Sequence, residues 1–133
     1  MRYLLDTNTC IYIAKRKPVQ VLSRLRRMRP GDVGMSVVTY LELVYGAWKS
    51  QSVEVNLAKI EQLRLLVPVQ SLDVGASKHY GRIRTELEKK GSPIGPYDLL
   101  IAAQALSLGL TLVTNSVREF AGVEGLRLEN WAD

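Results

Sequence analysis

Four acidic residues lie far apart in the sequence, yet each stands beside a short apolar segment or early in a helical one. Asp6 directly follows the first apolar segment, and Glu42 lies in the early turns of a helical segment that follows the second. Asp98 begins another helical segment, and Glu119 comes shortly after an apolar segment at residues 110–113. In a parallel sheet with crossover helices, all these positions lie at the edge where the strands end. We therefore expect the four carboxylates to meet at one rim.

A cluster of carboxylates is a natural site for a divalent cation. Neighbouring carboxylates repel, and one of them takes up a proton unless a cation lies between them. Oxygen ligands favour Mg²⁺ or Mn²⁺, whereas zinc prefers cysteine and histidine, of which this chain has one each, Cys10 and His79. A metal-bound water can attack phosphorus. Because the net charge of +5 attracts polyanions, the cluster indicates hydrolysis of a nucleic-acid phosphodiester.

Each acid also has a structural explanation when it is taken alone. Asp6 is a favoured residue type for a helix N-cap. Thr39 and Glu42 have the spacing of a capping box, in which the glutamate reaches back to the threonine backbone. Asp98 in a first helical turn complements the helix dipole, and Glu119 follows an arginine with which it can form a surface pair. The metal-site hypothesis therefore depends on all four acids converging.

Strands and helices are expected to alternate along the chain, which predicts an α/β protein with a mainly parallel sheet covered by helices on both faces. The expected strands are short and rich in Val and Leu, and helical segments with apolar residues at helical spacing separate them. We expect strands at residues 2–5, 33–35, 66–69, 110–113 and 126–128, and helices at 7–16, 19–29, 36–49, 56–65, 72–90 and 97–108.

The length and composition are those of one soluble domain, which we expect to span residues 1–133. A single cysteine excludes an internal disulfide and is typical of a reducing, cytoplasmic setting. The first ten residues do not have the pattern of a signal peptide. Polar residues interrupt the charge-free segment at 99–117, so we interpret it as a helix followed by a buried strand and expect no membrane contact.

Several of these segments resemble one known family. LLDTNTCIYI, SVVTYLELVYGAWKS, GPYDLLIAAQALSLGLTLVTNSVREF and LRLENW are similar to the PIN-domain ribonuclease toxins of the VapC type, in the same order along the whole chain. The resemblance implies a three-layer α/β/α sandwich and a Mg²⁺-dependent endoribonuclease, in which Mn²⁺ can substitute. Its implied catalytic residues are Asp6, Glu42, Asp98 and Glu119.

The resemblance also implies individual roles. Asp6 and Asp98 would be the principal metal ligands, and Glu42 would help to hold the ion directly or through water. The residues that follow the first strand, Thr7 and Asn8, would brace the first acid. Many relatives have an acid at the position of Ser116, and Glu119, one helical turn away, is the candidate for the missing charge. The supporting residues expected at this site are Thr7, Asn8, Thr114, Asn115 and Ser116.

The partners implied by the resemblance are those of a type II toxin. They are a cognate VapB-type antitoxin, an RNA substrate that is expected to be tRNA, and a second copy of the chain in a homodimer; DNA would be bound only through the antitoxin. The style of the motifs is similar to members that cut the anticodon stem-loop of initiator tRNA.

Basic and aromatic side chains offer further candidates. Lys15 and Arg82 are the first choices for contacts with the RNA backbone, although most such cations belong to ordinary solvated helix faces. Tyr12, Tyr45 and Trp48 have helical spacing, which favours packing in the core or in a dimer over base stacking. Three other residues are expected to be structural: Cys10 in the core, His79 on a helix surface and Trp131 holding the C-terminal tail.

Two other functions stay open. A receiver-type phospho-acceptor domain needs an aspartate directly after a middle strand and a lysine after a late strand. The expected third strand has no aspartate directly after it, and no lysine follows Lys90. A non-catalytic or regulatory PIN-like binding module is the second alternative, and the intact set of acids speaks against it.

Overall fold

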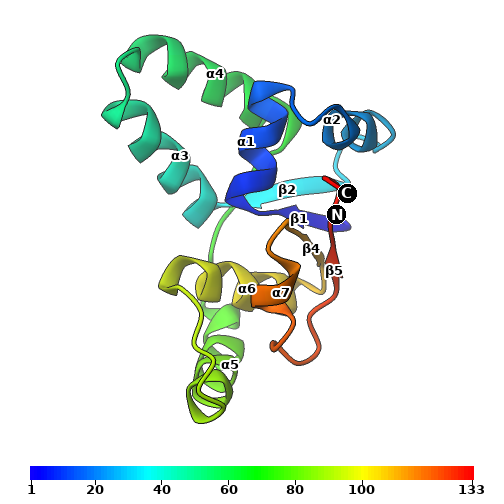
Figure 1. Cartoon of the computed structure of the whole chain (residues 1–133), viewed down its shortest axis with the longest axis vertical. Coiled ribbons are helices and arrows are strands. Elements are labelled where there is room, and N and C mark those ends of the chain that lie inside the picture. Colours follow the sequence, from blue (N-terminus) through cyan, green and yellow to red (C-terminus); the bar gives the residue numbers. More distant parts are fainter.

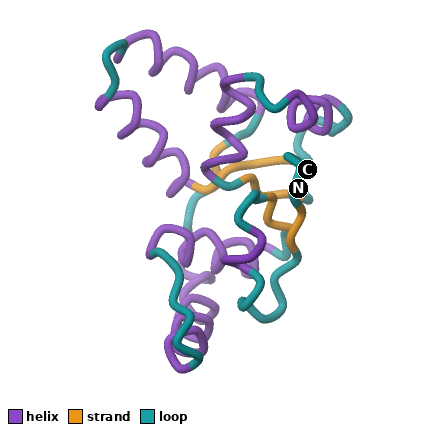
Figure 2. Tube along the Cα trace, viewed as in Figure 1, coloured by secondary structure: helices purple, strands orange, loops and turns teal.

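The computed structural model describes residues 1–133 and is an α/β fold built around five parallel strands in the order β3-β2-β1-β4-β5. The strands are short and lie at the centre of the molecule, between two groups of helices (Figures 1 and 2). This arrangement confirms the predicted α/β/α architecture. The elements are β1 (Tyr3–Leu5), α1 (Thr7–Lys15), α2 (Val19–Arg26), β2 (Val33–Ser36), α3 (Val37–Lys49), α4 (Val53–Leu66), β3 (Val69–Gln70), the 3₁₀ turn η1 (Val74–Ala76), α5 (Ser77–Lys89), α6 (Pro96–Leu108), β4 (Thr111–Val113), α7 (Val117–Phe120) and β5 (Leu128–Glu129).

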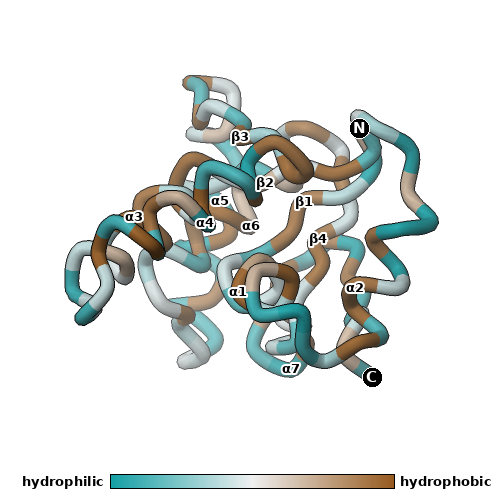
Figure 3. The backbone as a smooth tube through the Cα atoms, turned by 90° about the horizontal axis from the view of Figure 1, so that it is seen from above, coloured by the Kyte–Doolittle hydropathy of each residue, from teal (hydrophilic) through white to brown (hydrophobic).

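The sheet separates two hydrophobic cores, because successive side chains of a strand point to opposite faces. Tyr3 and Leu5 enter the core beneath α1 to α4, together with Cys10. Leu4 enters the core beneath α5 and α6, where it lies with Phe120 of α7. Much of β1 and β4 is hydrophobic in Figure 3, as expected for strands that helices cover on both sides.

The chain reverses its direction of travel across the sheet at β1. It proceeds from β1 to β2 and β3 on one side, and then returns to place β4 and β5 on the other side of β1. In open parallel sheets, the crevice at the carboxyl end of such a switch point is the usual place for a ligand. The segments that follow β1 and β4 therefore define where the functional site belongs.

Most predicted elements are present, but several boundaries are wrong. The third strand is Val69–Gln70 and not 66–69, because Leu66 completes the last turn of α4 with its side chain 60% exposed. The long helix expected from residue 72 begins only at Ser77, since Asp73 caps the intervening 3₁₀ turn through the backbone N–H of Gly75. The fifth strand lies two residues later than expected, at Leu128–Glu129, and α7 was not predicted.

Two structural predictions for single residues are confirmed. Cys10 is fully buried, and burial raises the pKa of its thiol, which keeps the side chain neutral. Trp131 is 2% exposed and meets Tyr3 edge to face at 5.4 Å between ring centroids, so it fastens the C-terminal segment to the first core. No helix is both long enough and apolar enough to cross a membrane.

Replacing Trp131 with alanine should destabilise the fold by about 3–5 kcal/mol, because the change leaves a cavity and removes the aromatic pair. Trp48 offers a matched control, since it is 66% exposed and its replacement by alanine should change stability by less than about 0.5 kcal/mol. Urea unfolding of both variants measures the difference. Equal losses of stability would show that Trp131 does not anchor the C-terminal segment.

Candidate active site

Strand register brings three residues to the carboxyl edge of the sheet in one row. Leu5 pairs with Met35 on one side and with Val113 on the other, so the next residues lie at the same edge: Asp6 and Thr114 directly after their strands, and Ser36 as the last residue of β2. All three are buried. Each then leads into a helix or a tight loop, and these segments bring the functional side chains to the rim.

Asp6 both caps α1 and faces the rim. Its carboxylate accepts a hydrogen bond from the backbone N–H of Thr9 at 2.9 Å, so the predicted N-cap role of Asp6 is confirmed. The side chain is 5% exposed, and this burial raises its pKa above the ordinary value. Hydrogen bonds from Thr114 and Thr9 act in the opposite direction and favour the ionised form. Neutral donors thus hold this carboxylate without a nearby positive charge.

Glu42 reaches the rim because α3 begins at the carboxyl edge, where the Ser36 side chain caps its first turn. The capping box predicted for Thr39 and Glu42 is wrong, since Ser36 is the N-cap and Thr39 lies inside the helix. Instead, the Thr7 hydroxyl donates to Glu42 Oε1 at 2.8 Å and lies 3.2 Å from the Thr39 hydroxyl. Thr7 therefore supports the second acid, and not the first acid as expected.

Asp98 lies in the first turn of α6 and is the acid most affected by its neighbours. Partial burial, followed by the charges of Glu119, Asp6 and Glu42 and a hydrogen bond with Glu119, raises the pKa of Asp98 to about 6. The four carboxylates predicted to converge therefore do interact at one edge of the fold. Glu119 reaches this edge because Phe120, beside it in α7, is 1% exposed in the second core.

The loop after β4 is held against α1 by a chain of side-chain hydrogen bonds. Asn8 donates from its amide to Asn115 at 3.3 Å, and Asn115 donates to the Tyr12 hydroxyl at 2.8 Å. The backbone N–H of Ser116 donates to the Thr114 hydroxyl, which tightens the turn into α7. Asn8 thus braces this loop, whereas the sequence interpretation assigned it to the first acid.

Sequence reasoning missed the role of Tyr12. Its side chain is half-buried and its hydroxyl is the last acceptor in the chain that begins at Asn8. The signal was available, because residues four apart lie on one face of a helix and Asn8 is four residues before Tyr12. Tyr45 and Trp48, which were grouped with Tyr12, are each 66% exposed, so the core alternative is wrong for both.

The acid rim provides only oxygen ligands, which suits a hard cation. No three acidic, histidine or cysteine side chains stand close enough to form a complete three-ligand centre by themselves. Mg²⁺ does not require such a centre, because it keeps several waters and binds through one or two carboxylates together with substrate phosphates. Burial and the repulsion of the neighbouring acids together raise the pKa of Asp98, and a bound cation would relieve the repulsion.

A groove of about 510 Å³ leads away from the rim between α1, α3 and α4. Thr7 and Glu42 lie along it, and Lys15 and Lys59 also line it. The floor is apolar and includes Ile60 and Leu63. Lys15 is thus placed beside the groove. Arg82 lies on α5, where it pairs with Glu86 at 3.3 Å, and its proposed contact with RNA stays a prediction.

Comparison with known proteins places this architecture and its rim of acids in an established class. The profile of the family described as PIN domain matches residues 3–125. The chain belongs to the PIN-domain family, in the group of VapC proteins.

Individual relatives match over nearly the whole chain. The chain is 46% identical over 132 residues to a tRNA(fMet)-specific endonuclease VapC of Shigella flexneri, covering 99% of both proteins. It superposes with a TM-score of 0.92 on the crystal structure of DNA-bound VapBC from Salmonella typhimurium, at 44% identity and with 98% of each chain covered. The VapBC-1 structure from nontypeable Haemophilus influenzae is similar at the same TM-score and 40% identity, with complete coverage of both chains.

Replacing Asp98 with asparagine should stabilise the metal-free protein at pH 7.5. Because the folded-state pKa is about 6 against an ordinary 3.8, ionisation of Asp98 costs folding free energy as the pH rises through this range. The gain should be about 1 kcal/mol, since the half-exposed carboxyl is partly screened by water, and it should vanish near pH 4. Thermal unfolding in EDTA at both pH values measures it. The exposed Glu124→Gln serves as the control, and an Asp98→Asn variant no more stable than this control at pH 7.5 would contradict the predicted repulsion.

Proposed function

We propose that this chain is the toxin of a type II toxin–antitoxin pair and hydrolyses phosphodiester bonds of tRNA with the help of Mg²⁺. The observation that carries the proposal is the meeting of Asp6, Glu42, Asp98 and Glu119 at the carboxyl edge of the sheet. Relatives that match almost end to end are named ribonucleases and endonucleases, which supports RNA cleavage as the activity.

The residues present suit the hard cation that the proposal requires. Asp6 and Asp98 would hold Mg²⁺, and Glu42 would do so directly or through a water. When bound, the ion supplies an activated water and offsets the charge that develops on the phosphate. Mn²⁺ would serve the same purpose, because it also prefers oxygen ligands.

The chain's own residues hold the acids of the site in position. Thr9 and Thr114 hold the Asp6 carboxylate in place by hydrogen bonds, and Thr7 holds Glu42 Oε1 at 2.8 Å. After burial, the charge of Glu119 is the next largest cause of the raised pKa of Asp98, so Glu119 is our candidate for the acid that is missing at Ser116.

The proposed substrate is the initiator tRNA, cleaved in its anticodon stem-loop. Two relatives with 46% and 44% identity, from Shigella flexneri and Salmonella typhimurium, are named tRNA(fMet)-specific endonucleases. A location in the cytoplasm, where tRNA is found, is part of the proposal.

The proposed protein partner is a VapB-type antitoxin, through which the pair would bind DNA. Solved relatives are VapBC complexes, two of them with DNA bound. An acidic rim is a natural receptor for an arginine side chain, and an antitoxin that inserted one would block the metal site. A noncatalytic binding module is the alternative that the experiments below distinguish.

The proposal includes a homodimer, because one helix face remains apolar and exposed. Leu41, Tyr45 and Trp48 project from α3 at helical spacing and are 61%, 66% and 66% exposed. Tyr97 of α6 lines a hollow of about 540 Å³ together with Leu41 and Tyr45. Contiguous exposed apolar side chains of this kind mark protein interfaces.

Replacing either Asp6 or Asp98 with asparagine should reduce the rate of RNA cleavage about 100-fold or more, because each change removes charge that holds the cation in the transition state. Cleavage of tRNA(fMet) in Mg²⁺, with Glu124→Gln as the control, measures the loss. EDTA should have the same effect on the wild-type protein.

Cleavage by Asp98→Asn at the wild-type rate would overturn the site assignment. Wild-type protein that neither cuts RNA nor binds Mn²⁺ in calorimetry would favour the noncatalytic module.

Replacing both Tyr45 and Trp48 with glutamate should convert the dimer to a monomer, since two desolvated charges cannot be accommodated in an apolar interface. Sedimentation equilibrium measures the mass. Leu65→Glu is the control, because Leu65 is 81% exposed on α4, outside this surface. A double variant that sediments like the wild type would show that the α3 face is not the contact between copies.

A further inference from the structure

Positive charge is concentrated in one short part of the chain. Residues 15–29 contain seven of the 18 lysines and arginines of the protein and no aspartate or glutamate. This segment comprises the end of α1, the turn that follows it, and α2 with the residues just beyond it. A protein with a net charge of +5 thus carries much of its uncompensated charge on two adjacent helices.

The cations of this segment are almost all free of ion pairs. Only Arg24 pairs with an acid, Glu129, at 3.0 Å. Asp32, which follows the segment, lies 3.9 Å from Arg2; its carboxylate accepts a hydrogen bond from the backbone N–H of Arg29 but forms no ion pair with a side chain of the segment. The α1–α2 basic surface consists of the six exposed and unpaired cations Lys15, Arg16, Lys17, Arg26, Arg27 and Arg29.

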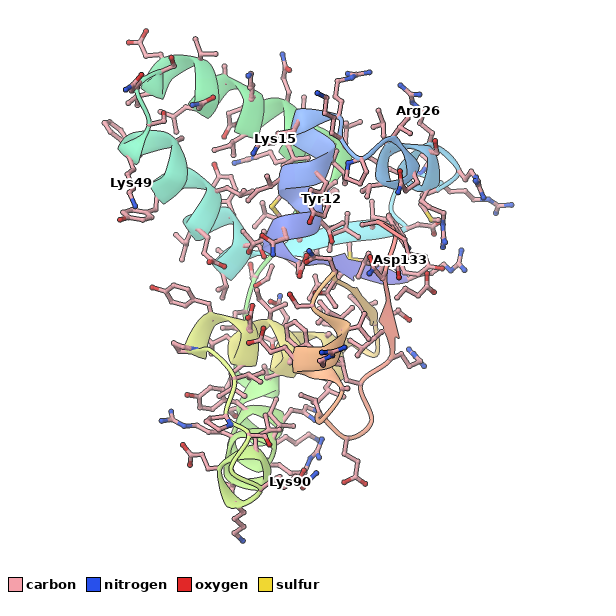
Figure 4. All side chains as sticks on the ribbon, viewed as in Figure 1. Tyr12, Lys15, Arg26, Lys49, Lys90 and Asp133 are labelled. Carbon is pink, nitrogen blue, oxygen red and sulfur yellow. The ribbon has the colours of Figure 1, made fainter.

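The arginines of α4 and α5 are arranged differently. Arg64, Arg82 and Arg84 lie on α4 and α5, and each pairs with a glutamate of its own helix at 3.2 to 3.7 Å. Ordinary solvated helix faces have such pairs. Nitrogen-tipped side chains spread outward around α2 in Figure 4, and the labelled Arg26 points away from the body of the protein. The α1–α2 basic surface therefore attracts anions, whereas glutamates of the same helix neutralise the arginines of α4 and α5.

The distance from the acid rim determines how this surface can act. Helix α1 has nine residues, so Lys15 lies about 14 Å along its axis from the end that carries Asp6. This distance exceeds the Debye length of about 8 Å at physiological salt, so salt largely screens the charge at this end of α1 from the scissile phosphate. Contacts with other phosphates of the RNA are the role that suits these cations. At about 3.4 Å per phosphate of one strand, 14 Å corresponds to roughly four base pairs of a duplex.

We propose that the α1–α2 basic surface binds the phosphate backbone of the base-paired stem that flanks the cleavage site of the RNA substrate. The inference rests on the proposed ribonuclease function and adds a second contact to it. Two packed helices hold the cations at fixed spacing, which suits the regular phosphates of a duplex. Such contacts position a structured RNA without reading its sequence.

The test compares two triple variants that lower the net charge equally. Arg26→Gln/Arg27→Gln/Arg29→Gln removes unpaired cations of the surface, and Arg64→Gln/Arg84→Gln/Lys89→Gln removes three exposed cations of α4 and α5, two of which pair with a glutamate. The first variant should bind tRNA(fMet) about 10-fold more weakly in EDTA, as measured by fluorescence anisotropy. The slope of log affinity against log salt should also become shallower by about 2 to 3, because up to three phosphate contacts are lost. The second variant should match the wild type within about twofold.

Kinetics provide a readout that a loss of folding would not reproduce. The first variant should raise the KM for intact tRNA about 10-fold with kcat unchanged, and should cut a seven-nucleotide RNA spanning the cleavage site as the wild type does. Arg26→Lys/Arg27→Lys/Arg29→Lys should restore most of the affinity. Equal effects of both charge-removing triples, or equal effects on both RNAs, would overturn the proposal.

Two further outcomes distinguish a failure of this proposal from a failure of the proposed ribonuclease function. Wild-type protein that cuts neither RNA would contradict the proposed function, while anisotropy would still report on the basic surface. Unchanged tRNA affinity in the first variant, together with a weakened antitoxin complex, would overturn the proposal and assign the surface to an acidic segment of the protein partner.

Discussion

Repulsion between carboxylates at the carboxyl edge of the sheet is the constraint on which the rest of the site depends. The fold keeps these acids together although partial burial and their mutual repulsion raise the pKa of Asp98 to about 6. No lysine or arginine forms an ion pair with the four acids. The groups that hold them are hydroxyls and backbone N–H donors, chiefly from Thr7, Thr9 and Thr114. The uncompensated negative charge is therefore left for a cation to bind.

The sheet topology produces this arrangement with few residues. Because β1 is central and the chain places β2 on one side and β4 on the other, the segments after β1 and β4 must meet. Asp6 then serves as the N-cap of α1 and as a member of the site. Phe120 also has two roles, because it packs in the second core and thereby fixes the position of Glu119. The stability of the cores and the geometry of the acids are thus coupled through the same short elements.

The distribution of positive charge complements this acidic rim. A polyanion is repelled by four carboxylates, so it requires favourable contacts elsewhere on the protein before its phosphate can approach a bound cation. The arginines of α4 and α5 are neutralised within their own helices, whereas those at the end of α2 are free. The acid rim and the basic surface lie about the length of α1 apart, so the two groups of charges do not neutralise each other in internal ion pairs.

The sequence by itself determined the alternation of strands and helices, the parallel sheet and the identity of the four acids. These features follow from local patterns, namely short apolar runs, helical spacing and residues such as Gly109 that end a helix. Boundaries at the sheet edges were less predictable. The apolar side chain of Leu66 predicts a strand, yet Leu66 belongs to the last turn of α4. The edge strand β3 that follows has only two residues, so it offers little pairing in place of the helix.

Only the tertiary structure decided which side chain supports which acid. Thr7 stands next to Asp6 in sequence, but its hydroxyl binds Glu42, 35 residues away. Helical spacing places Tyr12 on the same face of α1 as Asn8, but only the fold brings Asn115 close enough to donate a hydrogen bond to Tyr12. The physical reason is that strand register and helix packing set distances between residues remote in the chain, whereas sequence patterns report only on neighbours a few residues apart.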